Sequence, residues 1–461
     1  MDYRAAVDYL LTFADFERGS AARRSAEAFA LDRIKSLLAR LSLPQDGRTT
    51  VHVAGSKGKG STAAMIESVL RAAGYRTGLF TSPHLHEFTE RIRLDGRPLS
   101  GEAFAALVEK LQPVITDELS ADPGRLSTFE ILTAMGFVAF RDADVDVQVI
   151  EVGLGGRLDS TNVIREKAAA VVTALSWEHA DVLGSSLQKI AWEKAGIITP
   201  GATTAVLAPQ RSSEVVTTVR EYATDVYVPL VDVADAYRWE AAGREPSAQW
   251  FRLTRLQPRP GEAQRTLYLT PLLGLHQIEN AATAVATVEA LRAQGLEIPN
   301  KAIHQGLATV DWPGRLETLA REPWIVVDGA HNEESLERVL ESLPVYFDFE
   351  RLIVVLGVLG DKNVESMARR IREQAAAVVL TQPDHPRAQP PQIAAAAFEG
   401  WDRPLTIEPR VADALKAAEN LASPRDLICV LGSLFVAAEA RAHMRDSVGS
   451  EPTSARADRE P

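Results

Sequence analysis

Short apolar runs and longer segments of helical spacing alternate along this chain. The first run, Thr50 to Ala54, is short enough for a buried strand, and residues 62–73 after it favour a helix. The same alternation predicts strands at 76–81, 145–152 and 168–175 and helices at 101–119, 127–141 and 186–196. Strands that alternate with helices indicate an α/β protein with a mostly parallel sheet.

The flanking segments have patterns of their own. Residues 1–48 favour helix, with apolar residues at helical spacing over 26–43 until Pro44 ends the pattern. Residues 201–270 mix short apolar runs with Pro, Arg and Gly and are predicted to be rich in β-structure, and an alanine-rich helix over 274–292 follows. Beyond a candidate hinge at 312–315 the alternation restarts, with strands at 324–327, 352–356, 376–380 and 427–431.

Length and composition fit this pattern. A chain of 461 residues exceeds one compact core, so we expect domains at 1–310 and 314–446 and a disordered polar tail at 447–461. No run of 18 apolar residues suggests a membrane span, and the N-terminus lacks the pattern of a secretory signal. The single cysteine, Cys429, lies in an apolar run, which favours a buried thiol in a cytoplasmic protein. The formal charge of −12 argues against a nucleic-acid binder and, with anionic substrates, favours a divalent cation.

The segment from Gly55 to Ser61 has the composition of a phosphate-binding loop. Glycines let consecutive backbone N–H groups converge on an anion, the helix N-terminus adds positive dipole, and a lysine adds charge. Gly60, between Lys59 and Ser61, departs from the usual pattern, in which Gly-Lys directly precedes Ser or Thr. The alternative is an ordinary glycine-rich turn between a strand and a helix.

Other polar residues also follow predicted strands. They are Ser82, Glu151 and His179. Ligands of open parallel sheets bind beyond the carboxyl ends of the strands, so we expect these residues and the glycine-rich loop to share one rim. Taken alone, Glu151 is also compatible with a helix cap or an ion pair, and histidine is an unusual ligand for the hard Mg²⁺ ion.

Several motifs together resemble the folylpolyglutamate synthase and dihydrofolate synthase group of the Mur ligase superfamily. The motifs are Val53-Ala-Gly-Ser-Lys-Gly-Lys-Gly-Ser61, Thr81-Ser-Pro-His-Leu85, Glu151-Val-Gly-Leu-Gly-Gly-Arg-Leu-Asp-Ser-Thr-Asn162, Glu193-Lys-Ala-Gly-Ile197, His276-Gln-Ile-Glu-Asn280, Trp312-Pro-Gly-Arg-Leu-Glu317, Asp328-Gly-Ala-His-Asn332, Gly360-Asp-Lys-Asn363 and Gly432-Ser-Leu434. The resemblance covers residues 10 to 440. It implies a P-loop ATPase domain with a central, mostly parallel sheet and a smaller Rossmann-like C-terminal α/β domain that ligates glutamate.

The resemblance also implies a reaction and its partners. ATP phosphorylates a folate or dihydropteroate carboxylate, and the amino group of L-glutamate attacks the acyl phosphate. The implied nucleotide-binding residues are Gly55, Lys57, Gly58, Lys59, Gly60, Ser61, Asn280, Arg315 and Asp328. Lys59, Lys194 and His331 are the implied catalytic residues. We expect a monomer that binds neither nucleic acid nor a membrane.

The resemblance implies a site for two Mg²⁺ ions that comprises Ser82, Glu151, His179 and Lys194. A lysine ammonium is electrostatically wrong as a metal ligand, and the family resolves this by carbamylation, in which CO₂ turns the amine into an anionic oxygen donor. The alternative for Lys194 is a lysine that faces solvent on its helix.

The implied pterin pocket matches two stretches, made of Ser127, Thr128, Phe129 and Glu130 and of Leu158, Asp159 and Ser160. A phenylalanine at helical spacing is also common in a core, so Phe129 has a second interpretation. Arg387 is a candidate for binding a glutamate carboxylate.

Two other functions compete with this ligase. A Mur ligase acting on a peptidoglycan precursor needs a nucleotide-binding domain of roughly a hundred residues before the loop, and only 54 residues precede Gly55. A P-loop nucleotide-binding module without ligation leaves Glu151, His179 and Lys194 unexplained.

Overall fold

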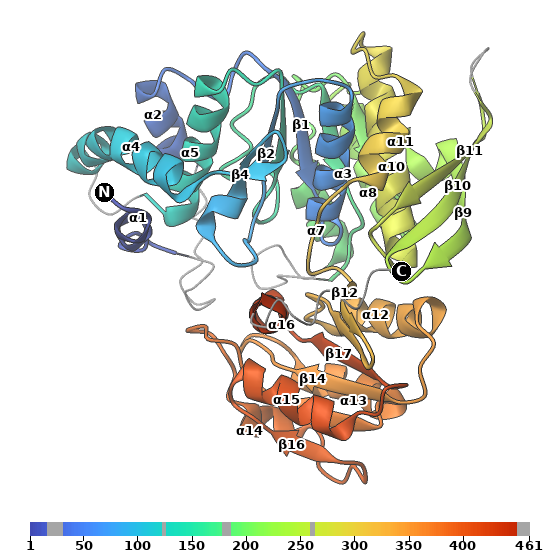
Figure 1. Ribbon diagram of the computed structural model, residues 1–461. Coiled ribbons are helices and arrows are strands. Elements are labelled where there is room, and N and C mark those ends of the chain that lie inside the picture. Colours follow the sequence, from blue (N-terminus) through green and yellow to red (C-terminus); the bar gives the residue numbers. More distant parts are fainter. Residues whose placement is uncertain (16–30, 122–125, 178–185, 259–262, 450–461) are drawn as a thin grey trace. The chain divides into compact units, whose positions relative to one another are not determined.

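The computed structural model describes residues 1–15, 31–121, 126–177, 186–258 and 263–449. The chain divides into two compact units (Figure 1). Unit 1 consists of Met1–Arg244, Ala248–Pro271 and Leu275–Asp311, and unit 2 of Glu245–Ser247, Leu272–Gly274 and Trp312–Pro461. None of the helices in the described ranges is both long enough and apolar enough to cross a membrane.

Unit 1 is built on an eight-stranded sheet in the order β4-β3-β2-β5-β1-β6-β7-β8. Its strands are β1 (Thr49–Ala54), β2 (Thr77–Phe80), β3 (Ile92–Leu94), β4 (Arg97–Pro98), β5 (Val147–Glu151), β6 (Ala169–Val172), β7 (Ala205–Leu207) and β8 (Leu230–Asp232). The strands from β2 to β8 in this order pair in parallel, whereas β3 and β4 pair antiparallel at one edge. The prediction of a mostly parallel sheet is therefore confirmed.

Helices cover both faces of this sheet. The helices of unit 1 are α1 (Tyr3–Leu10), α2 (Asp32–Arg40), α3 (Lys59–Ala72), α4 (Gly101–Ala121), α5 (Thr128–Asp142), α7 (Leu187–Ala195), α8 (Ser213–Asp225), α9 (Val233–Ala236), α10 (Leu275–Ala293) and α11 (Asn300–Ala308), with the 3₁₀ turn η3 (Phe88–Arg91). One buried cluster joins α1, α2, α4 and α5 to the sheet, and another joins α7 and α8 to β6 and β7. In Figure 1, α10 and α11 stand beside α3, which contacts both of them.

The segment predicted to be rich in β-structure is only partly so. It contains a three-stranded antiparallel sheet of β9 (Tyr237–Glu245), β10 (Ala248–Arg255) and β11 (Arg265–Thr270), but also the helix α8, which the prediction missed. Short apolar runs mixed with Pro, Arg and Gly predict β-structure here, yet Val215, Val219 and Ala223 recur every four residues and are buried. Helical spacing and burial against α7 therefore outweigh β-propensity here.

The first predicted helix is shorter than its apolar pattern. Helix α2 starts at Asp32 and buries Ile34, Leu37 and Leu38, as the spacing predicts. The earlier part of the pattern, residues 26–30, lies outside the described residues.

Unit 2 is a second doubly wound sheet, in the order β12-β13-β17-β14-β15-β16. Its elements are β12 (Glu317–Arg321), β13 (Trp324–Val327), α12 (Glu333–Tyr346), β14 (Leu352–Leu356), α13 (Val364–Gln374), β15 (Ala377–Leu380), α14 (Pro391–Ala396), β16 (Leu405–Ile407), α15 (Val411–Leu421), β17 (Leu427–Leu431) and α16 (Leu434–Gly449). Alternate residues of β14 face opposite ways: Val354 packs in the cluster with α12 and α13, and Ile353 in the cluster with α15 and α16. The four strands predicted in this part of the chain are confirmed.

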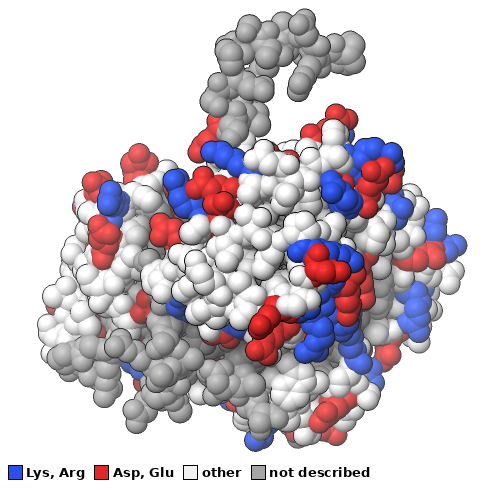
Figure 2. Space-filling model, turned by 90° about the horizontal axis from the view of Figure 1, so that it is seen from below, with Lys and Arg blue, Asp and Glu red and all other residues white. Residues whose placement is uncertain are grey.

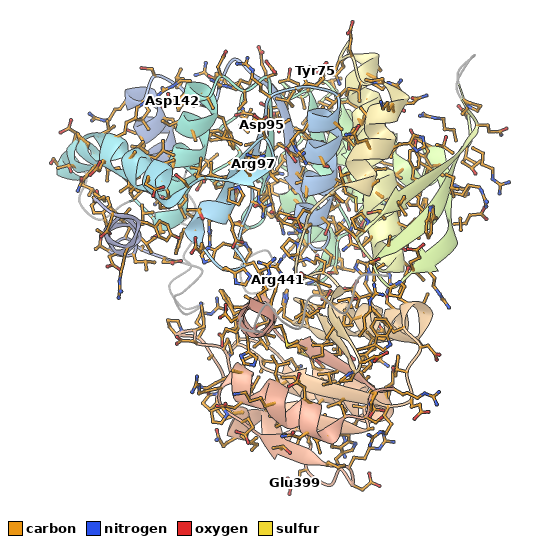
Figure 3. The ribbon with its side chains drawn as sticks, in the orientation of Figure 1. Tyr75, Asp95, Arg97, Asp142, Glu399 and Arg441 are labelled. Atoms are coloured by element: carbon orange, nitrogen blue, oxygen red, sulfur yellow. The ribbon has the colours of Figure 1, made fainter. Side chains whose placement is uncertain are left out.

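Helix α16 extends three residues into the segment predicted to be a polar tail, and residues 450–461 lie outside the described residues. Arg441 on α16 (Figure 3) donates to both carboxylate oxygens of Glu317 on β12, at 2.8 and 3.0 Å.

The buried thiol predicted for Cys429 is confirmed. On the face of the molecule shown in Figure 2, acidic and basic side chains are interspersed rather than gathered into one basic surface.

The core of unit 1 provides a stability prediction. Phe80 at the end of β2 is 1% exposed and packs against Phe129, with ring centroids 6.1 Å apart. We expect Phe80→Ala to lower the free energy of unfolding by about 3–5 kcal/mol, because it removes apolar contacts and leaves a cavity. Urea denaturation measures this, with Tyr227→Ala as the control, since Tyr227 is 93% exposed. A Phe80→Ala loss below about 1 kcal/mol would contradict the packing described here.

Candidate active site

The glycine-rich loop leaves the carboxyl end of β1, at the middle of the parallel sheet. Helix α3 begins at Lys59, earlier than the predicted position 62, so Lys59 and Ser61 lie in its first turn. The backbone N–H groups of Ser56 and Lys57 donate to the Ala174 carbonyl at 3.0 and 2.9 Å. These bonds tie the loop to the chain that leaves the neighbouring strand β6, so the loop is held from both sides.

Two lysines converge on the first residue of the loop. The Lys59 Nζ atom lies 3.2 Å from the Gly55 carbonyl oxygen, and the Lys194 Nζ atom of α7 lies 2.9 Å from the same oxygen. Lys194 is only 1% exposed, so the alternative of a lysine that faces solvent is wrong. Two lysine amino groups on one carbonyl, Lys194 buried and Lys59 half-buried, lie beside the N-terminus of α3, an arrangement suited to an anionic ligand.

Glycine is required at two points of the loop. Gly55 has φ +153°, and a Cβ atom there would lie 1.8 Å from Thr173 Oγ1. Gly58 has φ +83°, and its Cβ atom would lie 2.3 Å from the Oδ1 atom of Asn280 on α10. The side chain of Asn280 therefore lies against the loop, as the proposed nucleotide-binding role requires.

The next strands bring oxygen donors to the same rim. Glu151 ends β5 and is 4% exposed, and its Oε2 atom accepts a bond from the backbone N–H of Ser82, which follows β2, at 3.3 Å. A carboxylate and a hydroxyl suit the hard Mg²⁺ ion, whereas the ammonium of unmodified Lys194 does not. No group of three His, Cys, Asp or Glu side chains that could hold a metal ion occurs in the described ranges, and His179 lies outside them.

Three of the residues predicted to line the pterin pocket use their polar side chains for hydrogen bonds within the protein. Ser127 caps α5 in a capping box with Glu130, and Arg33 Nε donates to Glu130 at 3.0 Å, while Thr128 Oγ1 donates to the Leu10 carbonyl at 2.9 Å. The polar groups of these three predicted residues are thus used within the protein.

Phe129 is different. It is half-buried, and a Cβ atom on Gly153 would lie 2.4 Å from its ring, so the ring covers the start of the loop after β5. Leu158 in that loop is 45% exposed and Ser160 is half-buried. Burial raises the pKa of the Asp159 carboxyl, opposed by hydrogen bonds from Leu154 and Thr161 and by the charge of Lys59. Phe129 and Leu158 are therefore the predicted positions that remain available to a flat ligand.

Unit 2 has a polar turn of its own at the carboxyl end of β13. Asp328 accepts bonds from the backbone N–H groups of Leu316 and Ala330, both at 2.8 Å, and burial raises its pKa while the charge of Arg315 lowers it. His331 Nδ1 lies 2.9 Å from the Gly329 carbonyl, just before α12. Asp328 thus shapes the turn that presents Arg315 and His331.

Arg387, the candidate for binding glutamate, lies in unit 2. Its guanidinium donates to Asp361 at 2.5 Å. Desolvation raises the pKa of the Asp361 carboxyl, but Lys362 and Arg387 together lower that pKa to about 2.

Sequence reasoning missed a buried polar network beneath the loop. His52 Nε2 on β1 lies 2.8 Å from Thr161 Oγ1, which donates to Asp159 at 2.5 Å. Lys167, before β6, donates from Nζ to Asn162 Oδ1 at 2.6 Å. Burial lowers the pKa of Lys167 from 10.5 to about 7, and burial with the charge of Lys167 lowers the pKa of His52. Nothing in the pattern of the chain marks a lysine at the start of a strand as buried.

A glycine-rich loop with a lysine, at the carboxyl end of a parallel strand and beside a buried carboxylate, defines a nucleotide-binding α/β enzyme site. The model of the Mur ligase middle domain matches residues 53–288, and that of the Mur ligase, glutamate ligase domain matches residues 314–434. The chain belongs to the Mur ligase family, within its folylpolyglutamate synthase and dihydrofolate synthase group.

Named relatives support this assignment. A dihydrofolate synthase/folylpolyglutamate synthase of Bacillus subtilis is 35% identical over 90% of this chain and 95% of its own length. One of Mycobacterium tuberculosis is 36% identical over 89% of both chains. The chain spans about half, 51%, of a probable bifunctional folylpolyglutamate synthase/dihydropteroate synthase of Halobacterium salinarum, at 36% identity.

Solved structures agree. A folylpolyglutamate synthase of Mycobacterium tuberculosis complexed with ADP and AMPPCP has a TM-score of 0.84 at 34% identity, over 98% of this chain and 100% of that one. An FPGS–AMPPCP–folate complex has a TM-score of 0.82 at 29% identity, over 96% of this chain and 99% of that one.

The loop glycines give a prediction for nucleotide binding. We expect Gly58→Ala to raise KM for ATP by about tenfold or more, because its Cβ atom would displace Asn280 as well as strain the backbone. Gly74→Ala is the matched control, since Gly74 also has a left-handed φ, +94°, but open space around its Cβ position. Steady-state kinetics measure both variants, and equal effects would contradict the role of the Asn280 contact.

The buried lysine predicts a pH-dependent stability. Between about pH 7 and 10.5 the unfolded chain binds more protons at Lys167 than the native chain. The contribution of Lys167 to the free energy of unfolding therefore rises with pH in that window and is constant below it. We expect the free energy of unfolding of the wild type, relative to that of Lys167→Met, to rise by up to about 1.4 kcal/mol per pH unit in this window. Urea denaturation at several pH values measures the difference. The exposed Lys189 provides a control, Lys189→Met, and a gain of equal size there would refute the prediction.

Proposed function

We propose that this protein is an ATP-dependent ligase that adds L-glutamate to a folate, and to 7,8-dihydropteroate as well. The observation that carries the proposal is the convergence of Lys59 and Lys194 on the Gly55 carbonyl, at the rim where Glu151 and Ser82 meet. The family to which the chain belongs supports it, as do relatives named for both activities.

The reaction explains why cations and acceptors share the rim. A carboxylate oxygen of the pterin substrate attacks the γ-phosphorus of ATP, ADP leaves, and an acyl phosphate forms. The glutamate amine then attacks the acyl carbon, loses a proton and expels phosphate, so an amide remains. Lys59 and the loop N–H groups balance the charge of the β- and γ-phosphates, and they are held in place before ATP binds.

We assign Ser82 and Glu151, with His179, to Mg²⁺, which supplies charge neutralisation at the phosphates when bound. Lys194 joins them in its carbamylated form, since CO₂ addition to the neutral amine replaces a cation by an anionic oxygen donor. Gly55 to Ser61, with Asn280, Arg315 and Asp328, bind ATP in this proposal.

We assign His331 to the phosphates and Phe129 with Leu158 to the pterin ring. Ser127, Thr128, Glu130 and Asp159 then shape this pocket rather than contact the ring through free polar groups, and the half-buried Ser160 lies in the same loop as Leu158. The proposal also includes a cytoplasmic monomer with 1–310 as the ATP and folate domain and 314–446 as the glutamate-ligase domain.

The test is ADP release by the purified chain with Mg²⁺, ATP and L-glutamate. Dihydropteroate and tetrahydrofolate are supplied separately, and the glutamylated product is identified by mass. We expect ADP release to depend on glutamate and on at least one of the two pterins. Release that is independent of both pterins would refute the ligase proposal and leave a nucleotide hydrolase.

The role of Lys194 has its own test. We expect Lys194→Ala to lower kcat by about 100-fold or more, because it removes the anionic oxygen donor proposed to hold Mg²⁺ beside the reacting phosphate. Lys189→Ala on the exposed side of the same helix should keep wild-type kcat. Full activity of Lys194→Ala would exclude the carbamate.

A further inference from the structure

The C-terminal turn of α7, which carries Lys194, lies directly against the loop that follows β5. A Cβ atom on Gly156 would lie 2.8 Å from the Glu193 carbonyl oxygen and 2.9 Å from that of Lys194. The Arg157 N–H donates to the same Glu193 carbonyl at 2.9 Å. The turn and the loop are thus in backbone contact at Gly156 and Arg157.

Two side chains, the half-buried Asn162 and the buried Lys167, complete this contact at the C-terminal end of the helix. Asn162 Nδ2 donates to the carbonyl of Gly196, the C-cap of α7, at 3.1 Å, and to the Arg157 carbonyl at 3.0 Å. Lys167 Nζ donates to the next carbonyl, that of Ile197, at 2.7 Å, and to Asn162 Oδ1 at 2.6 Å. One amide and one amino group therefore hold two successive carbonyls just beyond Lys194.

Lys167 is an unusual residue for this place. Its side chain is 1% exposed, and among the described residues its amino group bonds two neutral oxygens and no carboxylate. Burying an amino group without a carboxylate is costly, and an apolar side chain would fill the space at lower cost. The carbonyls at the C-terminal end of α7 carry partial negative charge, which offsets part of this cost. Because a neutral amine keeps two N–H donors, both bonds persist in either protonation state.

The anchored end leads directly to the candidate active site. Lys194 precedes Ile197 by three residues, about one helical turn, and its Nζ atom lies 2.9 Å from the Gly55 carbonyl at the start of the glycine-rich loop. The backbone of Lys167 is itself fixed, because its N–H donates to Gly201 at 3.0 Å and its carbonyl accepts from Thr203 at 2.8 Å. Movement at the Asn162–Lys167 pair would therefore move Lys194.

We propose that Asn162 and Lys167 are positioning residues of the ligase, a clamp that holds the C-terminal turn of α7 so that Lys194 points to Gly55. The inference rests on the role proposed above for Lys194. The hydrogen bonds described for both residues go to one another, to the loop after β5 and to the end of α7, so the clamp acts through Lys194 on the chemical step and leaves ATP binding to the glycine-rich loop.

The experiment compares Lys167→Met and Asn162→Ala with the control Lys189→Met in the full chain. Lys189 lies on the same helix but is exposed. All assays run well below the measured Tm of each variant, so that loss of folded protein does not enter. Asn162→Ala removes a smaller group and carries the test if Lys167→Met does not fold.

We expect each clamp variant to lower kcat by about 100-fold, the cost of a small misplacement of a catalytic group, with KM for ATP within about twofold of wild type. Amide hydrogen exchange of residues 187–197 should be about tenfold faster in both clamp variants and unchanged in Lys189→Met. The fold-decrease in kcat of the double variant should be smaller than the product of the two single-variant decreases, because both residues act on one turn.

The outcomes separate this inference from the proposed function. If wild type shows no glutamate-dependent ADP release, the proposed function fails, while faster exchange in the clamp variants would still establish the anchoring. If wild type ligates glutamate and both clamp variants keep its kcat, the clamp is overturned. A rise in KM for ATP with unchanged kcat, or a lower Tm alone, would also overturn it in favour of a merely structural pair.

Discussion

The candidate active site depends on one backbone oxygen, the carbonyl of Gly55. The amino groups of Lys59 and Lys194 meet there, 3.2 and 2.9 Å away, although they come from helices more than a hundred residues apart in sequence. Gly55 can hold this position because it has no side chain: a Cβ atom would collide with Thr173, which directly follows the neighbouring strand β6. The Gly55 carbonyl therefore fixes where both amino groups lie within the site.

This local positive charge lies within a strongly acidic protein. The chain has a formal charge of −12, and its proposed substrates are a nucleotide, a pterin carboxylate and glutamate. Long-range attraction therefore does not favour their binding, and charges fixed within the site must do so. Burial makes those charges more effective, because water screens a charge within the site less than a charge on the surface.

The loop after β5 links these features. Its glycines allow backbone contact with α7, its Asp159 accepts bonds from Leu154 and Thr161, and its Asn162 reaches the end of the helix. The same segment is therefore close to Glu151, to the proposed pterin pocket and to Lys194. A substitution in this loop is expected to affect several functions together, because it has few side chains that can adjust independently.

By itself the sequence determined the α/β class, the parallel strands and the rim that gathers the loop, Ser82 and Glu151. Apolar runs and glycine-rich turns carry that information locally, and parallel strands bring their carboxyl ends to one edge whatever their order. It also marked Lys194 as a candidate. Only the tertiary structure decided that Lys194 is buried on Gly55, that Ser127, Thr128 and Glu130 are used in capping and packing, and that α8 is a helix. It alone revealed Lys167, because burial and hydrogen bonding depend on which segments meet in space, and no spacing along the chain records that a lysine at the start of a strand will meet the end of a helix thirty residues away.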